Sequence, residues 1–159
     1  MPEINEKTID ILKEIIAEVL KKMGILGTIV SKITYSSDGK EQISLNIKTL
    51  DAHILIGRRG ENLIALEHLV RVLFRKKNKQ LIPFVLDINN YKKEKEERLQ
   101  SIAHFAAAKV KKTGKEVVLR PMPAYDRRII HLFLAHEKQL TTESKGKEPN
   151  RQIVIKPIP

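Results

Sequence analysis

Two arginines between two glycines form the first group of residues that could bind a charged ligand. The segment Gly57-Arg58-Arg59-Gly60 follows an apolar run and precedes a stretch with helical periodicity. Glycine lets the backbone approach a ligand without a Cβ atom in the way, and the arginines add positive charge and N–H donors. A helix starting after the second glycine directs its free N–H groups to the same place. The segment is therefore predicted to bind phosphate.

An arginine and a histidine four residues apart form the second group. If residues 124–137 are helical, Arg127 and His131 project from one face. The side chains predicted to contact phosphate here are Arg127 and Arg128, with Arg120, Lys109 and Arg151 as weaker candidates. His131 could donate a hydrogen bond to phosphate or stack on a base, and the alternative is that it is incidental to function.

The apolar residues of this predicted helix indicate which face is buried. At about 100° per residue, four of them gather in one arc. They are Ile129, Ile130, Phe133 and Leu134. Arg127, His131 and Lys138 are therefore expected to project together on another, exposed face. Pro123 suits the first turn of a helix, so this face should be firmly oriented.

Several kinds of chemistry are absent from the sequence. The chain has no cysteine, which excludes disulfides and thiol catalysis. The glycine segment lacks the Gly-Lys-Ser/Thr ending of a P-loop, and no His-Glu-x-x-His pair is present. Asp126 and His131 would lie about 140° apart on a helix, which argues against an acid–base pair. We therefore expect no enzyme, cofactor or metal site, with a nuclease as the enzymatic alternative.

The net charge favours a polyanionic partner. The 159 residues contain 30 Lys+Arg against 19 Asp+Glu, for a formal charge of +11. Residues 1–50 are balanced at 7 and 7, whereas residues 51–88 hold 7 basic against 4 acidic and residues 89–159 hold 16 against 8. The excess thus begins at the glycine segment, as expected for nucleic-acid binding. No apolar run reaches the roughly 18 residues needed to span a bilayer, so a cytoplasmic protein without a transmembrane segment is expected.

Apolar periodicity and turn residues predict two small α+β domains, residues 1–89 and 90–159. The first should contain a helix over 9–23, strands over 29–35 and 43–47 joined by a turn at 36–40, helices over 50–56 and 63–73, and a strand over 83–88. The second should contain a helix over 90–113, a strand over 117–119, a helix over 124–137, and strands over 140–143 and 152–155.

The helix over 63–73 has a basic end. Its side chains are Arg71, Arg75, Lys76, Lys77 and Lys79. They could stabilise the C-terminus of the helix through its dipole, or contact phosphate directly.

The order of elements around the glycine segment resembles a type II KH domain. The resemblance implies the order α-β-β-α-α-β, a three-stranded sheet with helices on one face, and a loop that clamps about four nucleotides. Gly57, Arg58, Arg59 and Gly60 match this loop. Bases would then lie against a groove formed by Ile54, Ile56 and Leu63, for which an ordinary core role is the alternative.

Arg127-x-x-x-His131 and the tail over 141–151 resemble a small α/β module, the R-three-H domain, which binds single-stranded nucleic acid. A KH unit followed by this unit is similar to the Jag family, also called SpoIIIJ-associated proteins, of bacterial RNA-binding proteins. The match covers about residues 4–157. Many Jag proteins have an additional N-terminal domain, whereas the first KH helix here begins almost at Met1. The resemblance therefore does not by itself support a role that depends on that domain, such as a link to membrane-protein insertion.

The resemblance implies a regulator, post-transcriptional or linked to the cell envelope, that binds single-stranded RNA at both motifs. Single-stranded DNA is the alternative ligand. Aromatic residues make up 4% of the chain and tryptophan is absent, so base stacking should contribute little and sequence preference should be modest. The alternative function is a protein adaptor linked to cell division or membrane-protein insertion, with a protein partner such as another KH protein.

Overall fold

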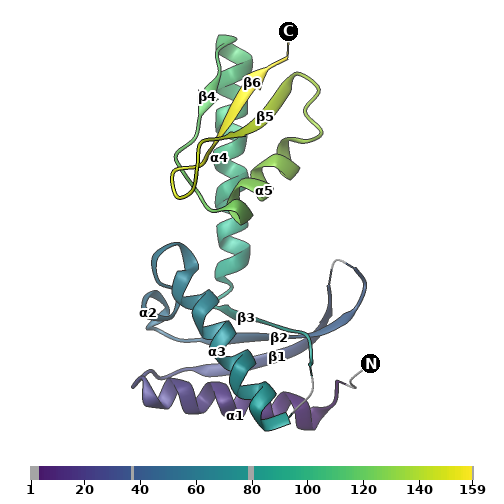
Figure 1. Cartoon of the computed structure of the whole chain (residues 1–159), viewed down its shortest axis with the longest axis vertical. Coiled ribbons are helices and arrows are strands. Elements are labelled where there is room, and N and C mark those ends of the chain that lie inside the picture. The colour runs from purple at the N-terminus through teal and green to yellow at the C-terminus, as the bar shows by residue number, and fades with distance from the viewer. Residues whose placement is uncertain (1–3, 37, 79–80, 159) are drawn as a thin grey trace. The chain divides into compact units, whose positions relative to one another are not determined.

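The chain forms two compact units, residues 1–92 and 93–159 (Figure 1). The computed structural model describes residues 4–36, 38–78 and 81–158. Each unit combines helices with a three-stranded sheet, so the predicted α+β class is confirmed. Two predicted features, the full turn at 36–40 and the basic side chain of Lys79, include positions outside the described residues.

The first unit contains its helices and strands in the predicted order. They are α1 (Glu6–Lys22), β1 (Thr28–Tyr35), β2 (Glu41–Lys48), α2 (Ala52–Ile56), the 3-10 turn η1 (Arg58–Gly60), α3 (Glu61–Asn78) and β3 (Phe84–Ile88). The side chain of Asn5 caps α1 by accepting a hydrogen bond from the backbone N–H of Thr8, at 3.0 Å. After α1, Gly24 adopts a φ of 68°, which favours glycine and ends the helix.

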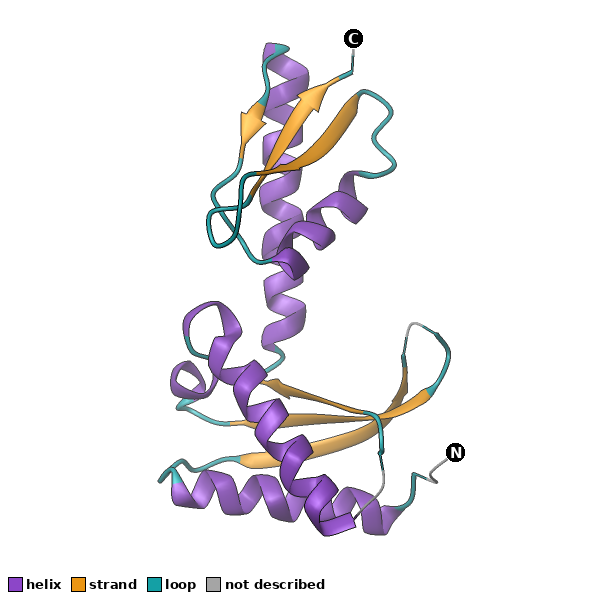
Figure 2. Cartoon of the chain, in the orientation of Figure 1, coloured by secondary structure: helices purple, strands orange, loops and turns teal. Residues whose placement is uncertain are grey.

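The sheet of the first unit has the order β1-β2-β3, with β1 and β2 antiparallel and β2 and β3 parallel. Alternate residues of β2 and β3 pair in register and are buried: Ile43, Leu45, Ile47, Phe84, Leu86 and Ile88. They form one core with the apolar stripes of α1 and α3, the two long helices that Figure 2 shows lying along this sheet. The helices therefore cover one face of the sheet, and the junction of α2 and α3 is held against this core.

The second unit contains most of α4 (Tyr91–Thr113), which begins before the division between the units. It continues with β4 (Val117–Val118), α5 (Ala124–Leu134), β5 (Leu140–Lys145) and β6 (Gln152–Pro157). The sheet order is β4-β6-β5, and both pairs are antiparallel. Ile153 and Ile155 of the central strand pack with Ala103 of α4 and Ile130 of α5.

Most elements begin or end a few residues from the predicted positions, and hydrogen bonds account for two of these differences in the second unit. Helix α5 ends at Leu134 rather than at Glu137, because the N–H of Ala135 bonds back to Leu132 and that of Glu137 to Leu134. Strand β5 continues to Lys145, since it pairs with β6 along its whole length. Among the described residues, no helix is both long and apolar enough to cross a membrane.

The packing of the first core predicts a large difference between two leucines. Leu86→Ala removes a side chain that is 0% exposed and should lower the free energy of unfolding by about 2–5 kcal/mol. Leu50→Ala, at a side chain that is 99% exposed, should change it by less than about 0.5 kcal/mol. Urea denaturation followed by circular dichroism measures both, and equal effects would contradict this account of the core.

Candidate nucleic-acid interface

The loop between α2 and α3 follows a path that depends on its glycines. Gly57 has φ 68° and ψ −173°, a combination that is nearly exclusive to glycine. Gly60 has φ 89°, and Arg59 between them also has a positive φ of 57°. The N–H of Gly60 closes the turn onto the carbonyl of Gly57 at 3.4 Å. The predicted loop is thus a tight turn that leads directly into α3.

Two side chains of the first unit pack against this turn. Asn62 donates a hydrogen bond to the carbonyl of Ile54 at 2.8 Å, and a Cβ atom on Gly57 would collide with the Asn62 side chain. A Cβ atom on Gly60 would lie 3.1 Å from the ring of Tyr91. The glycines are therefore needed both for their φ angles and because Asn62 and Tyr91 pack closely against them.

Arg58 and Arg59 are both exposed on this turn. They lie directly before the first turn of α3, whose 18 residues contribute a positive N-terminal dipole. The loop thus combines two arginines with a helix N-terminus, an arrangement suited to phosphate groups.

The predicted apolar groove is only partly exposed. Ile54 is 45% exposed and Ile56 is half-buried, but Leu63 is 2% exposed and belongs to the core. The core alternative therefore holds for Leu63. Ile64, which is 71% exposed in the first turn of α3, was not predicted. It falls outside the stripe formed by Leu63, Leu66 and Val70, so helical periodicity alone could have identified it as an outward-facing apolar side chain.

The basic end of α3 contributes one arginine to the fold itself. Arg71 pairs with Glu67 at 2.9 Å, donates to the carbonyl of Phe84 at 3.3 Å and lies 4.7 Å above the Phe84 ring. Glu67 in turn accepts from the N–H of Leu86 at 3.1 Å, on the edge of β3. Arg75, Lys76 and Lys77 remain exposed in the last turn of the helix.

The prediction that Arg127 projects from an exposed face is wrong. Arg127 is 5% exposed, and its guanidinium donates to the carbonyl of Met122 at 2.7 Å and to the carboxylate of Glu148 at 2.8 Å. The buried positions of α5 are Asp126, Arg127, Ile130 and Leu134, whereas Phe133 is 39% exposed. Helical periodicity could not predict this burial. A buried arginine needs hydrogen-bond partners, and those of Arg127 lie outside the helix, at a distance along the chain.

His131 connects α5 to β5. Its Nδ1 lies 2.7 Å from the hydroxyl of Thr142 and its Nε2 lies 3.0 Å from that of Ser144. Burial, and secondarily the charge of Arg127, lower the pKa of His131 below its ordinary value of 6.5. A neutral imidazole has one donor and one acceptor nitrogen, and the two hydroxyls can satisfy both.

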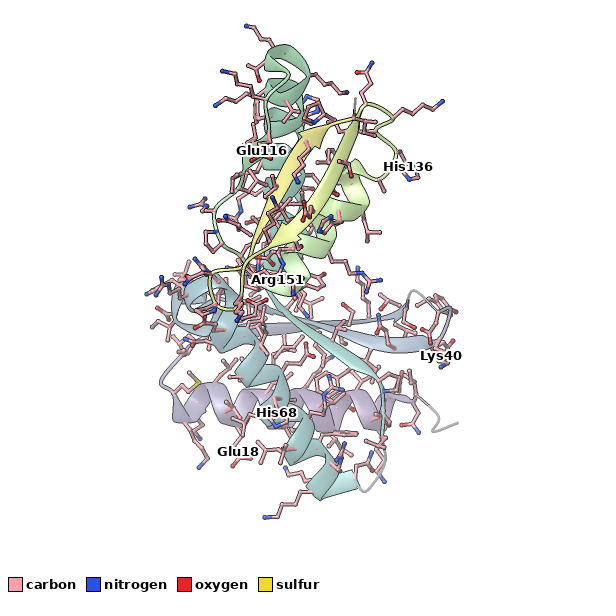
Figure 3. The ribbon with its side chains drawn as sticks, turned by 45° about the horizontal axis from the view of Figure 1, so that its top comes forward. Glu18, Lys40, His68, Glu116, His136 and Arg151 are labelled. Atoms are coloured by element: carbon pink, nitrogen blue, oxygen red, sulfur yellow. The ribbon has the colours of Figure 1, made fainter. Side chains whose placement is uncertain are left out.

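The remaining predicted cations of the second unit are exposed: Lys109, Arg120, Arg128 and Arg151. The N–H of Met122 bonds to the carbonyl of Arg151 at 3.1 Å, and that of Leu119 to Ile153 at 2.8 Å. The segment that carries Arg120 therefore runs beside Arg151. Arg151, which Figure 3 labels, ends the connection between β5 and β6. In the described part of the chain, no cluster of three or more acidic, His or Cys side chains could hold a metal ion.

The lowered pKa of His131 predicts a pH-dependent stability. As the pH falls below about 6.5, the unfolded chain takes up a proton that the folded chain does not, so folding loses stability. We expect the melting temperature to fall between about pH 7.5 and 5.5, and to fall less in His131→Gln. This range lies above the titration of Glu143, whose pKa is lowered by its hydrogen bond to Lys156.

His136→Gln, at an exposed histidine of the same unit, is the matched control and should melt like the wild type at each pH. Identical pH profiles for His131→Gln and the wild type would contradict this role of His131.

Comparison with known proteins gives one match within the second unit and others that extend over most of the chain. The R-three-H domain model matches residues 97–157. "RNA-binding protein KhpB" of Clostridium symbiosum is 35% identical over 96% of this chain and 65% of its own length. Proteins of the same name from Lactiplantibacillus plantarum and Bacillus subtilis are 30% and 35% identical, over 95% and 82% of this chain and 45% and 66% of theirs.

The chain thus spans less than two thirds of the length of these relatives. Residues 97–157 match the R-three-H domain model, and along most of its length the chain is similar to proteins named RNA-binding protein KhpB.

Proposed function

We propose that this protein binds single-stranded RNA through two sites, one in each unit, and catalyses no reaction. The observation that carries this proposal is the pair of exposed arginines, Arg58 and Arg59, on a glycine turn at the start of a helix. The excess of positive charge and the names of the relatives support the same ligand. A regulatory role at the post-transcriptional level is part of the proposal.

In this proposal residues 1–89 are a type II KH domain. The order of helices and strands and the position of the glycine turn between α2 and α3 support this assignment. The loop would hold the backbone of about four nucleotides while their bases lie beside Ile54 and Ile56. Ile64 is a further apolar side chain that a base could contact from the first turn of α3.

In this proposal residues 90–159 contain the R-three-H domain. Its Arg127 and His131 have a structural role, whereas the exposed arginines near them contact RNA. Arg127 and His131 use their polar atoms within the fold, and so would shape the surface rather than contact phosphate. Phosphates would instead be contacted by exposed side chains around the start of α5: Arg120, Arg128 and Arg151.

Charge reversal in the loop should weaken RNA binding. Arg58→Asp/Arg59→Asp places two carboxylates where phosphates would bind, and aspartate tolerates the positive φ of position 59. We expect affinity for single-stranded RNA to fall on the order of tenfold or more at low salt, with a shallower dependence on salt concentration. Fluorescence anisotropy over a salt series measures both quantities.

Lys21→Asp/Lys22→Asp is the control with the same change of charge, at an exposed pair in the last turn of α1. It should weaken binding much less than the loop variant. Equal losses would mean that the net charge, and not the loop, determines affinity. Binding that neither variant changes and that persists at high salt would instead favour the protein-adaptor function.

Two adjacent arginines should give opposite results. Arg127→Gln breaks the ion pair between the buried Arg127 and the exposed Glu148. It should lower the free energy of unfolding by about 1–3 kcal/mol, a limited loss because Glu148 can be rehydrated. Arg128→Gln should leave stability within about 0.5 kcal/mol but reduce RNA affinity several-fold. Urea denaturation and anisotropy on the same samples separate the two effects. If Arg127→Gln kept the wild-type free energy of unfolding but bound RNA more weakly, Arg127 would instead be a phosphate ligand.

A further inference from the structure

We propose that Tyr125 stacks on a base of the single-stranded RNA bound by the second unit, which makes this site aromatic as well as basic. The inference rests on the proposed function and adds a base contact to it. It also reverses the expectation that base stacking contributes little in a chain with 4% aromatic residues.

The Tyr125 side chain is available for a ligand. It is 65% exposed in the first turn of α5 and lies outside the hydrophobic core of its unit. Among residues 4–36, 38–78 and 81–158, none forms a hydrogen bond, ion pair or ring contact with it. By contrast, Phe74 and Phe84 are buried and Tyr91 packs against Gly60, so those rings are used by the fold.

Asp126 and Arg127, which follow Tyr125, fix the backbone at this position through their side-chain contacts. Asp126 pairs with Lys95 at 2.8 Å, between side chains that are only 7% and 19% exposed. Arg127 is bound to the carbonyl of Met122 and to Glu148. The first turn of α5 is therefore anchored on its inner side, and Tyr125 is presented outward on a rigid backbone. Because this backbone is already fixed, only the side-chain torsions of Tyr125 have to be ordered when a base binds.

Two exposed arginines belong to the same part of the second unit as this ring. Arg128 follows at i+3 on the same exposed side of α5, and residues three apart on a helix have Cβ atoms about 5–6 Å apart. Arg151 is tied to the start of α5 through the bond of its carbonyl to Met122. An exposed aromatic ring beside arginines can hold a base and its phosphate together, which is how single-stranded nucleic acid is bound with little sequence preference.

Abasic RNA separates a stacking contact from a phosphate contact. Binding of the full chain is measured by anisotropy with a short labelled oligoadenylate and with an abasic ribose-phosphate oligomer of the same length. Tyr125→Ala should weaken oligoadenylate binding on the order of tenfold, and Tyr125→Phe, which keeps the ring, by less than about twofold. Binding of the abasic oligomer should be the same in all three proteins.

A fluorescent probe tests the contact directly. The chain has no tryptophan, so Tyr125→Trp introduces a single indole at the proposed site. Oligoadenylate should quench its emission, and the abasic oligomer should not. Tyr35→Trp is the matched control, since Tyr35 is 68% exposed on β1 of the first unit, and its emission should not change.

The outcomes distinguish this inference from the function on which it rests. Wild-type protein that does not bind oligoadenylate would overturn both. Wild-type protein that binds, together with full affinity in Tyr125→Ala and no quenching in Tyr125→Trp, would overturn the stacking contact alone. An equal loss for abasic and base-containing RNA in Tyr125→Ala, with an unchanged melting temperature, would also overturn it.

Discussion

The buried guanidinium of Arg127 is the interaction on which the surface of the second unit depends. A cation that is almost excluded from water must be paired and hydrogen-bonded, or it destabilises the fold. Its partners here are the carbonyl of Met122 and the carboxylate of Glu148, which belong to the segment before α5 and to the β5–β6 connection. One side chain therefore fixes the start of α5 and a distant loop together, and so determines where Tyr125, Arg128 and Arg151 are presented.

In the first unit too, the residues that hold the backbone are different from the residues that are exposed. Asn62 and Tyr91 pack against the two glycines of the loop, and Asn62 also donates a hydrogen bond to the backbone of α2. Arg58 and Arg59 lie between these supported glycines and are exposed. In both units, supporting residues and exposed arginines are neighbours in sequence. One set holds the backbone in place, and the other set is exposed to solvent.

Much of the architecture could be predicted because it depends on local periodicity. The alternation in β2 and the stripe of α1 identified the first core, and the two glycines identified the loop. The errors occurred where residues far apart in sequence meet. Periodicity places Arg127 on the surface because its partner Glu148 lies 21 residues away. For Leu63 the sequence is compatible with either a groove or a core position, and only packing against the sheet determines that it is buried.

The sequence by itself determined the α+β elements, the position of the glycine turn and the excess of positive charge, since these follow from residue types at short spacing. Only the tertiary structure decided which of the adjacent residues Tyr125, Asp126, Arg127 and Arg128 face outward. The physical reason is that a polar side chain can be buried wherever the fold supplies matching partners, Lys95 for Asp126 and Glu148 for Arg127, and those partners are brought close only by folding.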